Sequence, residues 1–81
     1  MFKPSFIFNR NKLLQILSGI NVERVKGIFI TEQGIIAYNM ADNVLTEYEL
    51  DEAMDSRIEC IASNNKTLNN LEQKILGCLN P

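Results

Sequence analysis

The sequence predicts a small α+β domain: a mainly antiparallel β-sheet with two helices packed on one face, in the order β-α-β-β-β-β-α. Two observations predict it. Apolar residues recur at helical spacing near both ends of the chain, and between these segments they alternate as in strands. The middle segments are joined by connections of hairpin length, which favours antiparallel pairing of consecutive strands. With 81 residues, the chain is expected to form one domain.

The first two elements are expected to be a short strand over residues 5–8 and a helix. Pro4 precedes the strand, and proline is tolerated at a strand start. Asn9 or Asn11 is expected to cap the helix, and Gly19 is its stop signal. The helix has one apolar face, formed by Leu13, Ile16, Leu17 and Ile20.

Three strands are expected to follow as a meander, over residues 22–31, 35–40 and 44–50. The first turn contains Gly34, which is free to take a positive φ. The second turn contains Asp42 and Asn43, two residue types that tolerate left-handed backbone and bond their own main chain. These turns predict that the three strands pair in sequence order.

The third strand of the meander alternates strictly between two faces. One face carries Val44, Thr46, Tyr48 and Leu50, and the other carries Leu45, Glu47 and Glu49. This pattern is typical of a sheet with one wet side and one inner side, which the two helices can cover. After an acidic loop over residues 51–56, a last strand over residues 57–62 alternates in the same way, with Cys60 on its inner face.

A closing amphipathic helix is expected after the polar segment 63–67, which offers several N-cap residues. Its apolar stripe consists of Leu68, Leu71, Ile75, Cys78 and Leu79. The two cysteines of the chain, Cys60 and Cys78, have no metal-type spacing and are too few for a disulfide framework. We therefore expect both to be reduced, small core residues.

Composition disfavours several classes of function. The net charge is −2, which argues against a nucleic-acid partner, because such proteins normally present a basic surface. No stretch resembles a membrane span or a signal peptide, so we expect a cytoplasmic protein without a membrane partner. The chain has no histidine, and its "NNKT" run lacks the glycines of a phosphate-binding loop. Neither catalysis nor metal binding by this chain is expected.

Cationic residues mark the segment "NVERVKGIFI", residues 21–30. A strand here places Arg24 and Lys26 on one face and Gly27 on the other. With Arg57, which also lies near a strand start, the two cations could form one patch at an end of the sheet. Alternatively, they are ordinary surface charges, and each cross-strand pair contributes little. The acids available for such pairs are Glu23, Glu47, Glu49 and Glu59.

The run "ERVKGIFIT" resembles the signature of the C-terminal domain of the CobW family, in which an Arg-x-Lys-Gly element opens a central strand. The matching residues are Arg24, Lys26 and Gly27, and the apolar run that follows is Ile28, Phe29 and Ile30. The resemblance covers residues 5–79. It includes the Arg57 strand "DSRIECIA" and a helix that ends in "LGCL".

Members of that family join a P-loop GTPase domain to this smaller domain and deliver metals such as zinc or cobalt, the latter in cobalamin biosynthesis. The resemblance implies that residues 1–81 are a CobW C-terminal-like domain of a longer protein, whose GTP, magnesium and metal sites belong to the GTPase domain. It implies a non-catalytic accessory domain that contacts its cognate GTPase domain or a client protein. The contacts are then expected at Arg24, Lys26, Gly27 and Arg57.

A second interpretation assigns the chain to a different class of function. Ferredoxin-like regulatory domains sense small molecules and dimerise through their sheets, and this type of fold serves many functions. An independent sensor of this kind is the alternative to the accessory domain, and an enzyme is the least favoured reading. The sequence leaves the oligomeric state open.

Overall fold

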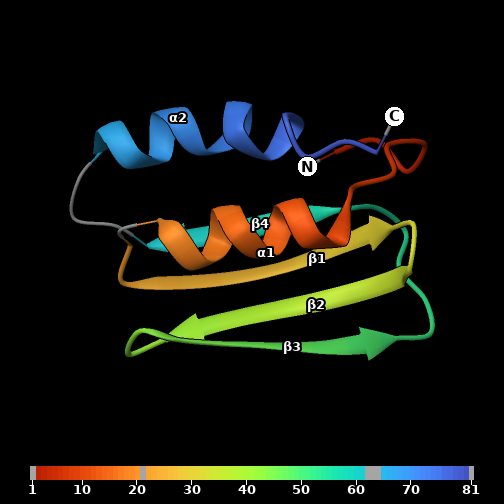
Figure 1. The fold of residues 1–81 in the computed structure, drawn as a ribbon, viewed down its shortest axis with the longest axis horizontal. Coiled ribbons are helices and arrows are strands. Elements are labelled where there is room, and N and C mark those ends of the chain that lie inside the picture. The colour runs from red at the N-terminus through yellow and green to blue at the C-terminus, as the bar shows by residue number, and fades with distance from the viewer. Residues whose placement is uncertain (1, 21, 62–64, 81) are drawn as a thin grey trace.

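The computed structural model describes residues 2–20, 22–61 and 65–80 and has the predicted α+β architecture. Its elements are α1 (Arg10–Gly19), β1 (Arg24–Thr31), β2 (Gly34–Ala41), β3 (Val44–Leu50), β4 (Arg57–Ile61) and α2 (Asn65–Leu76). The strands form one antiparallel sheet in the order β3-β2-β1-β4. Both helices lie on the same side of this sheet (Figure 1). The predicted fold class is confirmed.

The segment predicted as the first strand, residues 5–8, contributes only isolated bridges at Phe8. The Phe8 N–H donates to the carbonyl of Ile30 at 2.9 Å, and the Phe8 carbonyl accepts from the N–H of Glu32 at 3.2 Å. A second bridge joins Phe8 to Leu79, near the C-terminus. The pairing stops here because α1 begins at Arg10, directly after its cap.

Helix α1 has the cap and the apolar face that the sequence predicts. Asn9 is the N-cap, and its side chain accepts a hydrogen bond from the N–H of Lys12 at 3.0 Å. Leu13 and Leu17 are fully buried, and the helix ends at Gly19.

Helix α2 buries Leu71 and Ile75 of the predicted stripe in its second half. The helix ends at Leu76, so Cys78 and Leu79 follow it rather than belong to it, and Cys78 is also buried. The first part of that prediction lies outside the described residues. This applies to the cap candidates at 63 and 64, to Ala62 at the end of the predicted strand, and to the side chain of Leu68.

The two hairpin turns follow the predicted backbone chemistry. Gly34 begins β2 with a φ of 110°. Asp42 and Asn43 form a two-residue turn with φ values of 52° and 64°. Positive φ at both central residues is the mark of the type I′ turn, whose twist matches that of a β-hairpin. The turns therefore fix the register of β1, β2 and β3.

The core lies between the sheet and the two helices. Its largest fully buried side chains include Phe8, Phe29, Tyr38, Leu13 and Leu17. The Phe29 ring is T-shaped to both Phe8 and Tyr38, with centroid distances of 5.3 and 6.0 Å. Such edge-to-face contacts add to the free energy of burial and help to fix a single packing arrangement.

The structure shows that the more apolar row of β3 is not the inner one. In the β2–β3 ladder, the buried residues Met40 and Tyr38 pair with Leu45 and Glu47. The row that begins at Val44 therefore faces away from the helices. Hydrophobicity alone predicts the opposite, but Glu47 is tolerated on the helix side because Arg10 forms an ion pair with it at 3.0 Å.

Candidate functional site

Within residues 2–20, 22–61 and 65–80, no helix or strand covers the side of the sheet that faces away from the two helices. We call this side the open face. Strand alternation and the three ladder registers assign to it Arg24, Lys26, Ile28, Ile30, Ile35, Ala37, Asn39, Ala41, Val44, Thr46, Tyr48, Leu50, Arg57, Glu59 and Ile61. It combines aliphatic side chains with four charged ones, Arg24, Lys26, Arg57 and Glu59.

The open face carries the large apolar side chains that the sheet leaves most exposed. Val44 is 60% exposed, Ile61 57% and Tyr48 51%. These residues lie on the two edge strands, β3 and β4. The alternation of β3 was also consistent with an inner face for Val44 and Tyr48, whereas that of β4 already placed Ile61 opposite the inner Cys60. Only the register with β2 reveals the exposure of Val44 and Tyr48.

The three predicted cations all lie on the open face, but they do not gather at one end of it. Arg24 pairs with Ile61 at one end of the β1–β4 ladder, and Arg57 pairs with Ile28 at the other end. The two strands are antiparallel, so residues near their starts lie at opposite ends. Lys26 lies between them, so the cations form a diagonal across β1 and β4.

The cations differ in how their charges are balanced. Arg57 binds the carboxylate of Asp55 through Nη2 at 2.9 Å and Nε at 3.0 Å. Lys26 lies opposite Glu59 in the ladder. Neither Arg24 nor Lys26 has a carboxylate within 4.0 Å in the described part of the chain. Two acids considered as partners, Glu47 and Glu49, are on the helix side, where both pair with Arg10.

The fourth predicted site residue, Gly27, is on the opposite side of β1 from the cations. A side chain at this position would point toward the core, and an added Cβ would meet the ring of Phe29 at 2.9 Å. Gly27 therefore allows the aromatic core to pack closely under the strand. The "RVKG" run is divided into two outward cations, Arg24 and Lys26, and two inward packing residues, Val25 and Gly27.

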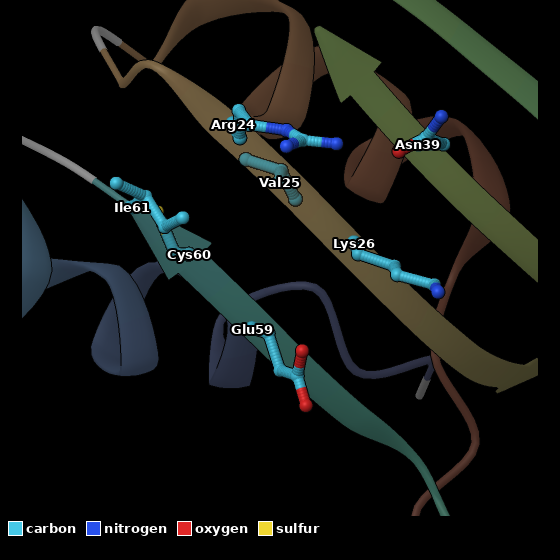
Figure 2. A pocket seen from close by; sticks show the side chains of 7 residues that line it. All are labelled: Arg24, Val25, Lys26, Asn39, Glu59, Cys60 and Ile61. Carbon is cyan, nitrogen blue, oxygen red and sulfur yellow. The ribbon is translucent and has the colours of Figure 1, made fainter.

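A shallow depression of about 270 Å³ lies on the open face between β1 and β4. Its lining residues are Arg24, Val25, Lys26, Asn39, Glu59, Cys60 and Ile61. Figure 2 shows Arg24 and Lys26 extending from β1 and Glu59 extending from β4 beside it. A second depression of about 110 Å³ adjoins it and shares Lys26 and Glu59. The arrangement presents two cations and one acid around a small hollow, and it can hold a carboxylate or an amide group.

The two thiols and the Tyr38 phenol are on the helix side of the sheet, where Cys78 and Tyr38 are buried and Cys60 is partly buried. Burial raises the pKa of the Cys60 and Cys78 thiols, so both are poor nucleophiles. Both cysteines are free. Burial also raises the pKa of Tyr38, and the charge of Glu47 adds to this shift. The hydrogen bond with Glu47 raises the pKa of the Arg10 guanidinium.

No three Cys, Asp or Glu side chains within residues 2–20, 22–61 and 65–80 gather closely enough to hold a metal ion. None of the described helices has both the length and the hydropathy that crossing a bilayer requires.

Comparison with protein-family models, with curated proteins and with solved structures found no match to this chain.

Proposed function

We propose that this chain is a non-catalytic accessory domain that binds another protein through its open face, and that the partner is the GTPase domain of a CobW-like metal-delivery protein. The observation that supports the proposal most directly is the composition of the open face. Exposed aliphatic and aromatic side chains lie there beside Arg24 and Lys26, which have no ion-pair partner among the described residues.

A protein partner explains this mixture better than the other classes of partner. A nucleic acid would require an extended basic surface, whereas the chain has a net charge of −2. A protein surface with one or two carboxylates among apolar side chains would pair with the cations and cover Val44, Tyr48 and Ile61. Charge-assisted hydrogen bonds to arginine and lysine are stronger when apolar neighbours exclude water.

The resemblance to the CobW C-terminal domain adds a reason for the location. The residues that carry it include Arg24 and Lys26, which project from the open face, and Gly27, which packs inward. We interpret the run as one element with two roles, contact and packing. In this proposal GTP, magnesium and the delivered zinc or cobalt belong to the partner domain, and this chain contributes binding only.

The proposal is tested by isothermal calorimetry of the chain against a CobW-family GTPase domain, with and without GTP and zinc. We expect binding whose affinity depends on the nucleotide. Replacing Arg24 and Lys26 by alanine should weaken it about tenfold or more, because two charge-assisted hydrogen bonds would be lost.

A matched control removes two exposed cations that are not part of the open face, Lys3 and Lys12. This double alanine variant changes the net charge by the same amount and should bind normally. If both double variants lose the same affinity, the effect is one of net charge alone and the open face is not the contact. An absence of binding in every nucleotide state would overturn the proposal.

A second candidate is a small-molecule sensor, and the depression beside Arg24, Lys26 and Glu59 favours it. Its volume suits a ligand of a few heavy atoms with a carboxylate group, since binding pockets of larger ligands begin near about 300 Å³. Binding heat from a small carboxylate or from zinc alone, without heat from the GTPase domain, would select this candidate.

A further inference from the structure

The open face is divided into two halves that differ in charge. The half formed by β1 and β4 carries every charged residue assigned to this face, namely Arg24, Lys26, Arg57 and Glu59. The half formed by β2 and β3 carries only apolar and neutral polar side chains. Each half consists of two neighbouring strands, because the sheet order is β3-β2-β1-β4.

We propose that two copies of the chain associate through their open faces, about a twofold axis that runs parallel to the strands between β1 and β2. This rotation places β3 of one copy over β4 of the other, and β2 over β1. The charged half of each copy then covers the uncharged half of the other. Residues that share a row across the sheet remain at the same height along the axis.

The ladder registers give the facing residues row by row. In the first row, Val44 and Ile61 occupy the two edges, so Val44 of one copy faces Ile61 of the second. These are the two most exposed aliphatic side chains of the sheet. Their contact removes apolar surface from water at both ends of the row, because the twofold axis repeats it.

The inner rows are also complementary. Tyr48 of one copy faces Arg57 of the second. A guanidinium over a tyrosine ring is a favourable cation–π contact. In the next row, Thr46 faces Glu59 and Asn39 faces Lys26, so each charged group meets a neutral polar one. No like charges face each other in this arrangement.

The depression between β1 and β4 has a matching group in the second copy. Its lining includes Arg24, Lys26, Glu59 and Ile61, which occupy the first two rows of the charged half. The same rows of the uncharged half carry Val44 and Thr46 on the edge strand. Their side chains would enter the depression and exclude water from it.

The other simple twofold arrangement has its axis across the strands and is less favourable. It places each strand of one copy over the same strand of the second, so that Val44 on β3 cannot face Ile61 on β4. The contact between these two exposed aliphatic side chains therefore favours the axis parallel to the strands.

The area of the open face predicts a weak dimer. Four strands about 4.8 Å apart and seven residues about 3.4 Å apart give a face of about 450 Å² per copy, or about 900 Å² in total. Stable interfaces bury about 1,200 Å² or more, so association should depend on concentration. The same face is proposed to bind the GTPase domain, so the second copy and that domain would compete.

The test is sedimentation equilibrium of the chain alone, over a wide range of concentration, with three single variants. Val44→Lys and Ile61→Glu each introduce an unpaired charge at both symmetric contacts, and each should weaken dimerisation at least about tenfold. An equal mixture of the two variants should restore it. A mixed dimer pairs the introduced lysine with the introduced glutamate at one contact and keeps Val44 with Ile61 at the other. Leu14→Lys, at an exposed position of α1, should have no effect.

Three results would overturn the proposed dimer: a wild-type chain that stays monomeric throughout, a mixture that associates no better than its components, or an equal loss in Leu14→Lys. Far-ultraviolet circular dichroism of each variant verifies that the fold is kept. Because the experiment contains no GTPase domain, a monomeric result leaves the proposed docking function untouched. A dimer that shows no nucleotide-dependent docking would support the proposed dimer and contradict the proposed docking function.

Discussion

Gly27 and Phe29 pack against each other on the helix side of β1. A Cβ added at Gly27 would lie 2.9 Å from Cε2 of Phe29 and 3.3 Å from the carbonyl oxygen of Arg57. The Phe29 ring is fully buried between Phe8 and Tyr38, so it has little space into which to move. The glycine in the "RVKG" run is therefore required by core packing, whatever binds to the other side of the strand.

Replacing Gly27 by alanine should lower the free energy of unfolding by about 1–3 kcal/mol, because the added methyl group overpacks a filled core. Urea unfolding followed by circular dichroism measures the change. Gly19→Ala is the matched control, since an added Cβ there meets nothing within 4 Å and the residue is helical. Its stability should be unchanged or higher. Equal losses in both variants would contradict the packing explanation.

Ser56 provides a buried hydrogen bond that secures β1. It is fully buried, and its Oγ accepts a hydrogen bond from the N–H of Ile30 at 2.9 Å. Ser56→Ala would leave that N–H without its partner, so unfolding free energy should fall by about 1–3 kcal/mol. Ser18→Ala, at an exposed position of α1, should cost nothing measurable in the same urea titration. A neutral Ser56→Ala would show that water or a shifted backbone satisfies the N–H.

The turn between β2 and β3 predicts opposite effects for two substitutions of one residue. Asn43 has a φ of 64°. Asparagine tolerates this left-handed conformation better than alanine, and glycine adopts it without steric cost. Asn43→Ala should therefore lower stability by about 1 kcal/mol, and Asn43→Gly should maintain or raise it. Thermal unfolding ranks the three proteins. Asn11→Ala, on the exposed side of α1, controls for loss of an amide group. If its midpoint falls as much as that of Asn43→Ala, the left-handed backbone at Asn43 does not explain the loss.

Structural features that depend on residues close together along the chain could be predicted from the sequence. The cap at Asn9, the turn at Asp42 and Asn43, and the identity of each strand follow from local backbone chemistry and side-chain period. The inner face of β3 did not, because its choice depends on Arg10, which is distant in sequence and neutralises Glu47 from α1.

The candidate site was predicted in part for a similar reason. Strand alternation alone places Arg24 and Lys26 on one face, and the structure has them there. The position of Arg57 relative to Arg24 depends on how β4 pairs with β1, and antiparallel pairing separates them. The place of Val44 and Ile61 in the site follows only from the sheet order, which puts both residues on edge strands. Long-range pairing, rather than local pattern, decides which side chains share a surface.

Tyr38 is expected to make stability depend on pH in the alkaline range. Its ring is fully buried, and its hydroxyl has no hydrogen-bond partner among the described residues. Burial raises its pKa above the ordinary value of 10.0, and the charge of Glu47 adds to the shift. The unfolded chain therefore loses this proton at a lower pH than the folded protein does. The resulting contribution to stability is fully present below about pH 10 and is lost as the pH rises from there through the folded pKa.

Tyr38→Phe removes this titration. Its unfolding free energy should therefore fall less steeply above about pH 10 than that of the wild type, by up to about 1.4 kcal/mol per pH unit. Urea unfolding at several pH values between about pH 8 and about pH 11 gives both profiles. Tyr48→Phe, at the half-exposed tyrosine of the open face, is the control and should follow the wild-type profile. If Tyr38→Phe also runs parallel to the wild type, the buried hydroxyl does not couple folding to pH, and the alkaline loss of stability has another source.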